Sequence, residues 1–199
     1  MVNKLKDIYE NPADLWIYKR IDEHMHIYKK LHFSPNILTT ISLSIGLFSA
    51  YQILQGNLII AAILWMISYY FDCADGKFAR KYNMVTKFGD IYDHASDGIK
   101  TLAVLYALIK TTIKRGKKLI LNNKQWLYIG LTLLLSILMF MNMGYQECIY
   151  NRNESLILGF CRLLVFFDKN PHKSIQYTKY FGCGTFNLCT ALIIIFWNK

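Results

Sequence analysis

The chain has 199 residues, of which 54% are hydrophobic and 18% are charged, and its formal net charge is +10. A soluble domain of this length carries more charge and shorter apolar runs, whereas several runs here approach the roughly 20 residues that cross a hydrocarbon core of about 30 Å. The composition therefore excludes an ordinary soluble domain and predicts an integral, multi-pass membrane protein.

An amphipathic pattern over residues 14–32 is the first element along the chain. Apolar residues recur there at helical spacing, while most charged residues fall elsewhere around the helix; the apolar set is Ile17, Ile21, Met25 and Tyr28. Because an apolar run follows at once, this pattern favours a helix in the membrane interface over a surface helix packed on a soluble core. We therefore divide the chain into an amphipathic juxtamembrane segment, residues 1–33, and one transmembrane domain, residues 34–199.

Apolar stretches of the second segment predict an all-α membrane bundle. Ser34 and Pro35 are typical of a helix start, with Ser as the N-cap and Pro in the first turn. The predicted spans cover about residues 34–54, 58–80, 88–113, 126–145 and 177–197. Residues 81–87 form a short polar link between the second and third spans.

Residues 146–176 allow two interpretations. Their apolar core, Leu156–Phe167, is short for a span and contains Arg162. It fits a re-entrant or interfacial helix, or a poor additional span, so five to six transmembrane helices are expected in all.

Much of the basic charge lies in short loops beside the apolar stretches. Anionic headgroups or an anionic substrate account for it better than nucleic acid, because the chain has no recognition-helix or zinc-finger pattern. One such loop, residues 114–124, follows the third span, so it lies across the membrane from the 81–87 link. If the link is cytoplasmic, this loop conflicts with the preference for Lys and Arg in cytoplasmic loops, and the orientation stays open.

Four aspartates lie where the second span ends and the third begins. Asp72 and Asp75 are three residues apart and Asp93 and Asp97 four apart, so each pair lies on one face of its helix. Antiparallel packing across the link brings the pairs together, and four close carboxylates require positive compensation. Hard oxygen ligands suit Mg²⁺, or less well Mn²⁺ or Ca²⁺, and four carboxylates can hold two ions.

The residues between these pairs fit a nucleotide diphosphate. Gly76 and Ala79 remove side-chain bulk, Arg80 offers a guanidinium for phosphate, and Gly89 lies where the third helix meets the ligand. Three lysines nearby are expected to add positive charge: Lys77, Lys81 and Lys87.

The segment from Asp72 to Asp97 resembles the signature of the CDP-alcohol phosphatidyltransferases, D-x2-D-G-x2-A-R-x8-G-x3-D-x3-D, without a gap. The matching residues are Asp72, Asp75, Gly76, Ala79, Arg80, Gly89, Asp93 and Asp97. Chance agreement at these positions is on the order of one in a billion per starting point. The amphipathic segment and the Pro35-Asn36-x-x-Thr39 opening of the first span are also similar to this family.

The resemblance implies a transferase of phospholipid biosynthesis with six transmembrane helices. It makes Asp72, Asp75 and Asp93 metal ligands and places Asp97 at the metal site as general base. Gly76, Ala79, Arg80 and Gly89 then shape the CDP pocket. Mg²⁺ neutralises the donor diphosphate, Asp97 takes the acceptor proton, and attack on the β-phosphorus releases CMP. A homodimer is implied by the resemblance alone.

Two substrate pairs stay open. CDP-diacylglycerol with an alcohol acceptor is favoured by the short chain, because the choline and ethanolamine enzymes are much larger. CDP-choline or CDP-ethanolamine with diacylglycerol is favoured by His94 next to Asp93, although His94 is better explained by a hydrogen bond to Asp90. A non-catalytic carboxylate-lined transporter or scaffold explains buried aspartates but not the Gly, Ala and Arg at fixed spacing.

Overall fold

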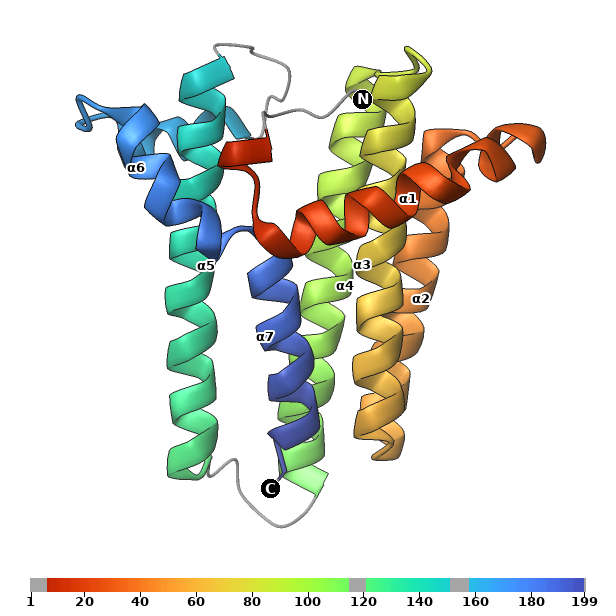
Figure 1. Cartoon of the computed structure of the whole chain (residues 1–199). Helices are drawn as coiled ribbons and strands as arrows, with labels where there is room; N and C mark the ends of the chain where they lie inside the picture. The colour runs from red at the N-terminus through yellow and green to blue at the C-terminus, as the bar shows by residue number, and fades with distance from the viewer. Residues whose placement is uncertain (1–6, 115–120, 151–157, 199) are drawn as a thin grey trace.

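The computed structural model of the protein describes residues 7–114, 121–150 and 158–198, which are helical without strands. The α-helices are α1 (Pro12–Lys30), α2 (Pro35–Gln55), α3 (Leu58–Lys81), α4 (Lys87–Lys114), α5 (Asn123–Tyr150), α6 (Pro171–Thr178) and α7 (Cys183–Phe196). The 3-10 helices are η1 (Asp7–Tyr9), η2 (Leu158–Val165) and η3 (Lys179–Phe181). In Figure 1, α2, α3, α4, α5 and α7 run side by side, and α1 lies across one end of them.

The first two long helices form an antiparallel pair with well-defined ends. Ser34 Oγ accepts a hydrogen bond from the Ile37 amide at 3.3 Å and Pro35 occupies the first turn of α2, as the sequence predicts. The helix ends at Gly56, whose φ of +85° is in the left-handed region that favours glycine. This tight turn sends α3 back along α2.

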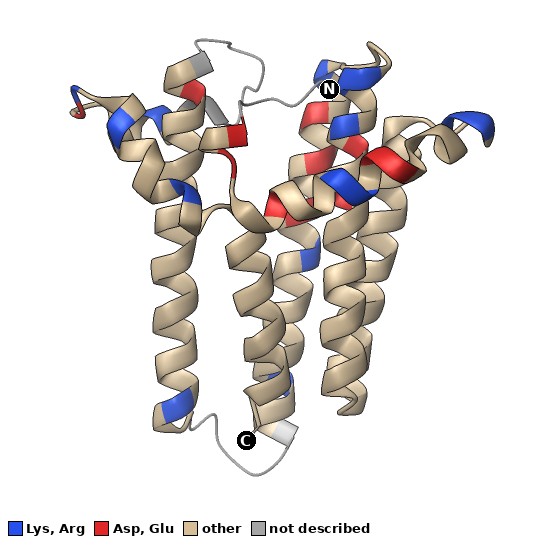
Figure 2. Ribbon diagram, in the orientation of Figure 1, with Lys and Arg blue, Asp and Glu red and all other residues tan. Residues whose placement is uncertain are grey.

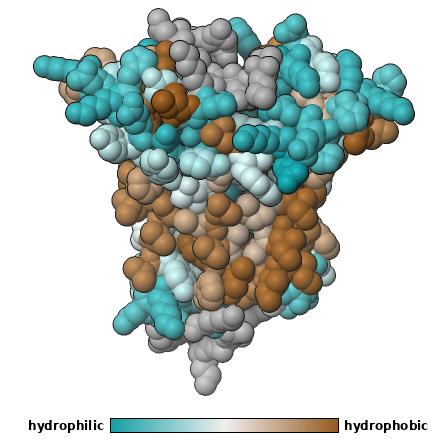
Figure 3. Space-filling model, viewed as in Figure 1, coloured by the Kyte–Doolittle hydropathy of each residue, from teal (hydrophilic) through white to brown (hydrophobic). Residues whose placement is uncertain are grey.

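Among the described residues, four helical segments are long and apolar enough to cross a membrane: α2, α3, Asn123–Ile149 of α5, and Pro171–Phe196, which joins α6 to α7. Helix α4 lies among them in Figure 1 but carries Asp90, Asp93, Asp97 and Lys100 in its first half. The predicted all-α polytopic bundle is confirmed, and the protein is an integral membrane protein. Large apolar side chains such as Ile59 and Leu127 are exposed around it, and Figure 3 shows them as a belt below a hydrophilic end.

The amphipathic helix α1 packs its apolar face on the bundle. Ile17, Ile21 and Met25 are buried in a cluster with Tyr69 and Phe78 of α3, which confirms the predicted face. Charged residues gather at the end of the bundle where α1 lies, as Figure 2 shows. The apolar face of α1 thus packs on the bundle itself, and its place at a membrane interface stays a prediction.

The last predicted span, residues 177–197, is not one continuous helix. Residues 177–182 belong to the end of α6, to η3 and to Gly182, whose extended backbone separates them from α7. Gly182 packs against α1, because a Cβ atom there would lie 3.0 Å from the Cβ atom of Asn11. The Asn11 amide also donates to the Lys179 carbonyl oxygen and the Thr185 hydroxyl, at 2.7 and 2.9 Å. These contacts with the N-terminal segment explain the break in the helix.

The described part of residues 146–176 has no helix long enough to span by itself. Helix α5 continues to Tyr150, and η2 and α6 have eight residues each. Helix η2 packs on α5 at Gly144, where a Cβ atom would collide with the Cys161 carbonyl group. The short, non-spanning interpretation is therefore the better one for residues 158–170, while residues 171–176 belong to the Pro171–Phe196 segment and residues 151–157 lie outside the described part. Residues 115–120 of the basic loop also lie outside it.

Candidate metal and nucleotide site

Helix α2 positions the two carboxylate pairs. Both α3 and α4 pack extensively on α2, so the end of α3 and the start of α4 face each other beside it. The 81–87 link joins them at the end of the bundle where α1 lies (Figure 1). A cavity of about 290 Å³ opens between these elements, with further walls from α1 and α7.

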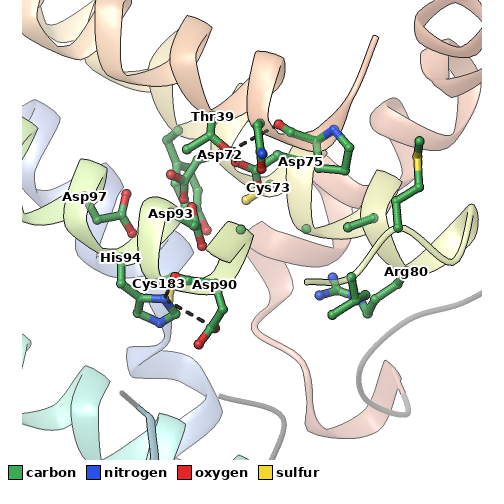
Figure 4. A pocket seen from close by; sticks show the side chains of 18 of the residues that line it. Thr39, Asp72, Cys73, Asp75, Arg80, Asp90, Asp93, His94, Asp97 and Cys183 are labelled. Carbon is green, nitrogen blue, oxygen red and sulfur yellow. Dashed lines mark hydrogen bonds and ion pairs between the residues drawn. The ribbon is translucent and has the colours of Figure 1, made fainter. Parts of the chain in front are cut away.

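Three of the four predicted carboxylates converge. One oxygen atom from each of Asp72, Asp93 and Asp97 lies within 4.8 Å of the other two, a spacing at which they could hold a metal ion. Figure 4 shows the three side chains around one region of the pocket. Asp75 also lines this pocket but is held separately, because its Oδ2 accepts a hydrogen bond from the Thr39 hydroxyl at 2.5 Å. Thr39 is therefore the partner of Asp75 and supports it from α2.

The chemistry of this group fits a divalent cation. Within the described part of the chain, Asp93 Oδ1 is a buried oxygen atom without a hydrogen-bond partner. Buried carboxylate oxygens without a donor are costly unless a cation satisfies them. Oxygen ligands of this kind suit Mg²⁺, Mn²⁺ or Ca²⁺ rather than a soft metal.

Lys100 is a member of this site that the sequence did not suggest. Its ammonium group lies 2.7 Å from Asp72 Oδ1 and 2.7 Å from Asp97 Oδ1, the latter as an ion pair outside hydrogen-bond geometry. It also donates to the Ser42 hydroxyl at 2.9 Å. The spacing contained a signal, because Lys100 follows Asp97 by three residues and shares its helix face.

The predicted nucleotide residues line the same cavity. Gly76 lies beneath the Arg80 side chain, since a Cβ atom there would meet Arg80 Nη1 at 3.3 Å. Gly89 lies close to Asn36, with 3.3 Å between a Cβ atom there and Asn36 Oδ1. Arg80 Nε is buried without a hydrogen-bond partner among the described residues, which suits a guanidinium that receives an anion. Figure 4 shows Arg80 on the opposite side of the pocket from Asp97.

The lysines expected around the diphosphate point elsewhere. Lys77 is buried against α1, where its ammonium group donates to Asp22 Oδ2 at 2.6 Å and to the Tyr18 carbonyl oxygen at 2.9 Å. Lys81 and Lys87 are exposed and do not line the cavity. The positive charge beside the carboxylates comes from Lys100 instead.

Helix α1 supplies a wall of the cavity that the sequence did not suggest. Asp14 is buried and accepts hydrogen bonds from the Tyr69 hydroxyl and the Gly184 amide, which ties α1 to α3 and α7. Burial raises the pKa of Asp14 from 3.8 to about 6, although both hydrogen bonds act in the opposite direction. Gly184 is required at this contact, because a Cβ atom there would collide with the Asp14 carboxylate.

His94 makes a local contact within its own helix, which is the simpler of the two interpretations of this residue. Its Nδ1 lies 2.7 Å from the carbonyl oxygen of Asp90, one helical turn earlier, which confirms the predicted contact. Both residues line the cavity, where Figure 4 shows their contact as a dashed line.

Comparison with known proteins agrees with this arrangement. The family model described as CDP-alcohol phosphatidyltransferase matches residues 32–199. An uncharacterized protein of Aquifex aeolicus (strain VF5) is 31% identical over 98 residues, which are 49% of this chain and 45% of that protein. The chain therefore spans about half the length of this relative. No solved structure matches this chain. Since the family model covers most of the sequence and the signature residues lie around one cavity, the chain belongs to the CDP-alcohol phosphatidyltransferase family.

Proposed function

We propose that the protein is an enzyme that transfers a phosphatidyl group from CDP-diacylglycerol to an alcohol acceptor and releases CMP. One observation carries the proposal: all eight signature residues, from Asp72 to Asp97, line the same cavity at the charged end of the bundle. A non-catalytic transporter or scaffold gives no reason for the glycines and Arg80 to share a cavity with the carboxylates. Chemistry on a nucleotide diphosphate does give one.

Asp72, Asp93 and Asp97 are the proposed ligands of the divalent ion, with Asp75 beside them. When bound, the ion supplies positive charge that neutralises the donor diphosphate, and Mg²⁺ is the proposed ion, with Mn²⁺ as a substitute. Arg80 pairs with diphosphate oxygen atoms through its guanidinium group. Gly76, Ala79 and Gly89 leave room for the nucleotide.

Asp97 is the proposed general base. It accepts the proton of the acceptor hydroxyl as that oxygen bonds to the β-phosphorus of the donor. The bond from this phosphorus to the bridging oxygen breaks, and CMP leaves with the electron pair. Asp97 suits this role because 44% of its side-chain surface is exposed and it lines the cavity, so an acceptor can reach it.

CDP-diacylglycerol is the proposed donor because the feature that favoured the other branch has a local explanation. The hydrogen bond of His94 to the Asp90 carbonyl oxygen is the ordinary contact of a helical histidine. CDP-choline or CDP-ethanolamine with diacylglycerol stays as the alternative, and the same assay distinguishes the two.

The test is CMP release by the purified protein in detergent with Mg²⁺. CDP-diacylglycerol, CDP-choline and CDP-ethanolamine are each combined with a panel of acceptors, and Asp97→Asn is the matched blank. We expect release by the wild type with CDP-diacylglycerol and a rate at least about 10²-fold lower in the variant, the usual contribution of a positioned base. Equal release by both proteins contradicts the assignment of Asp97. No release from any pair by folded protein supports the non-catalytic alternative.

A further inference from the structure

Lys100 has a position that the proposed reaction does not explain. Its side chain is 6% exposed and is not among the residues that line the cavity. Its ammonium group nevertheless contacts both Asp72 and Asp97, each at 2.7 Å. The carboxylates thus line the cavity, while the cation that they contact does not.

Small residues on α2 and α3 make room for this lysine. A Cβ atom on Gly46 would lie 2.9 Å from the Lys100 Cβ atom and 3.1 Å from its Cδ atom. Ser42 and Ser68 each donate to the carbonyl oxygen of the other, at 3.0 and 2.8 Å, and Ser42 also accepts from the ammonium group. The aliphatic part of the Lys100 side chain thus packs against Gly46, and its ammonium group has a hydroxyl acceptor in Ser42. The helix packing therefore accommodates this buried lysine specifically.

The contacts limit where metal ions can bind. Asp72 and Asp97 each direct Oδ1 toward the ammonium group, and Asp75 is held by Thr39. A second divalent ion that bridged the Oδ1 atoms of Asp72 and Asp97 would meet the ammonium charge at close range, where like charges repel strongly. One oxygen atom from each of Asp72, Asp93 and Asp97 lies within 4.8 Å of the other two, which is a spacing for one ion.

We propose that Lys100 is a resident cation of this cluster, which takes the place of a second divalent ion and leaves a site for one ion between Asp72, Asp93 and Asp97. Lys100 is thus a positioning residue that acts through the carboxylates. The inference rests on the proposed function, because it takes this cluster to be the metal site of the transfer reaction.

The test is to count Mn²⁺ ions bound by the purified full chain in detergent, without nucleotide, from the electron paramagnetic resonance signal of free Mn²⁺. We expect one ion per chain in the wild type and in Lys100→Arg, which keeps the charge. In Lys100→Met, which keeps the length of the stem and removes the charge, we expect two. Lys77→Met is the matched control, because Lys77 is an equally buried lysine that pairs with an aspartate away from the cluster. This variant should bind one ion per chain.

Two ions in the wild type, or none, overturn the proposal. So does one ion in Lys100→Met, or two in Lys100→Arg or Lys77→Met. If Lys100→Met does not fold, the wild-type spectrum at saturating Mn²⁺ decides: an uncoupled six-line signal supports one ion, and a spin-coupled pair overturns it. CMP release is measured on the same samples. Wild type that releases CMP and binds two ions refutes only this inference, whereas one ion without CMP release from any substrate pair refutes only the proposed function.

Discussion

Two buried lysines, Lys77 of α3 and Lys100 of α4, have similar surroundings and different roles. Their side chains are 3% and 6% exposed, and their ammonium groups lie 2.6 and 2.7 Å from an aspartate. Lys77 pairs with Asp22 and a backbone carbonyl oxygen, which fixes α1 on α3. Lys100 instead faces a cluster with more carboxylates than one ammonium can neutralise. Burial and an ion pair are thus common to both lysines, and of the two only Lys100 faces negative charge in excess of its partners.

The same contrast separates the aspartates. Asp14, at the junction of α1, α3 and α7, has hydrogen bonds from Tyr69 and Gly184 and acts as an architectural residue. Asp93 has a buried oxygen atom without a partner in the described part of the chain. We therefore expect substitutions of aspartates whose oxygen atoms have partners to change stability, and substitutions in the carboxylate cluster to change metal binding.

The largest expected effect compares two aspartates of the cluster. Asp72→Asn removes a converging oxygen ligand and the partner of Lys100, so we expect Mn²⁺ affinity to fall by about 100-fold or more. Asp75→Asn changes a residue held by Thr39, and we expect a loss of about tenfold, at the low end of the range for residues that support a ligand. Isothermal titration of both variants with Mn²⁺ measures the difference. Equal losses would place Asp75 among the ligands.

An intermediate effect is expected at Asp14, in the stability of the protein. Its pKa is about 6 in the folded protein and near 3.8 when unfolded, so the protonated carboxyl favours folding at low pH. That contribution is complete below pH 3.8 and is lost as the pH rises through 6, which leaves a cost of about 3 kcal/mol at pH 7.5. Asp14→Asn removes this cost but also one of two hydrogen-bond acceptors, so we expect a net gain of about 2 kcal/mol in the free energy of unfolding.

Unfolding of Asp14→Asn in detergent at pH 7.5 and at pH 4 measures this gain. The variant should be more stable than the wild type at pH 7.5 and should lose that advantage at pH 4. A gain of the same size at both pH values would show that ionisation of Asp14 is not its cause.

The smallest effect is expected at Lys77. Lys77→Met should lower the free energy of unfolding by about 1 kcal/mol, because Asp22 loses its buried partner but is itself partly exposed. Arg20→Met breaks an exposed pair with Glu23 on the same helix as Asp22 and should cost less than about 0.5 kcal/mol. Thermal unfolding of the two variants measures the contrast. Equal costs would mean that the Lys77 pair does not hold α1 in place.

Much of the fold followed from local patterns. The periodicity of Ile17, Ile21 and Met25 predicted the face of α1 that is buried, and Ser34 and Pro35 predicted the start of α2. The break at Gly182 within the last predicted span was not foreseen, because it depends on Asn11, which lies 171 residues earlier in the chain. Hydropathy reports the length of an apolar run, and it has no information about such a contact.

For the candidate site, the sequence by itself determined which residues are proposed to carry the chemistry. The spacing of Asp72, Asp75, Asp93 and Asp97 within one helical hairpin places the carboxylates at one end of the bundle, because helix periodicity and a short link leave little freedom. Only the tertiary structure decided how these charges are divided. The packing of α3 and α4 on α2 turned Lys100 toward the cluster, gave Asp75 to Thr39 and directed Lys77 to α1. The physical reason is that the partner of a buried charge depends on which helices meet and in what register, and that register is a property of the packed bundle.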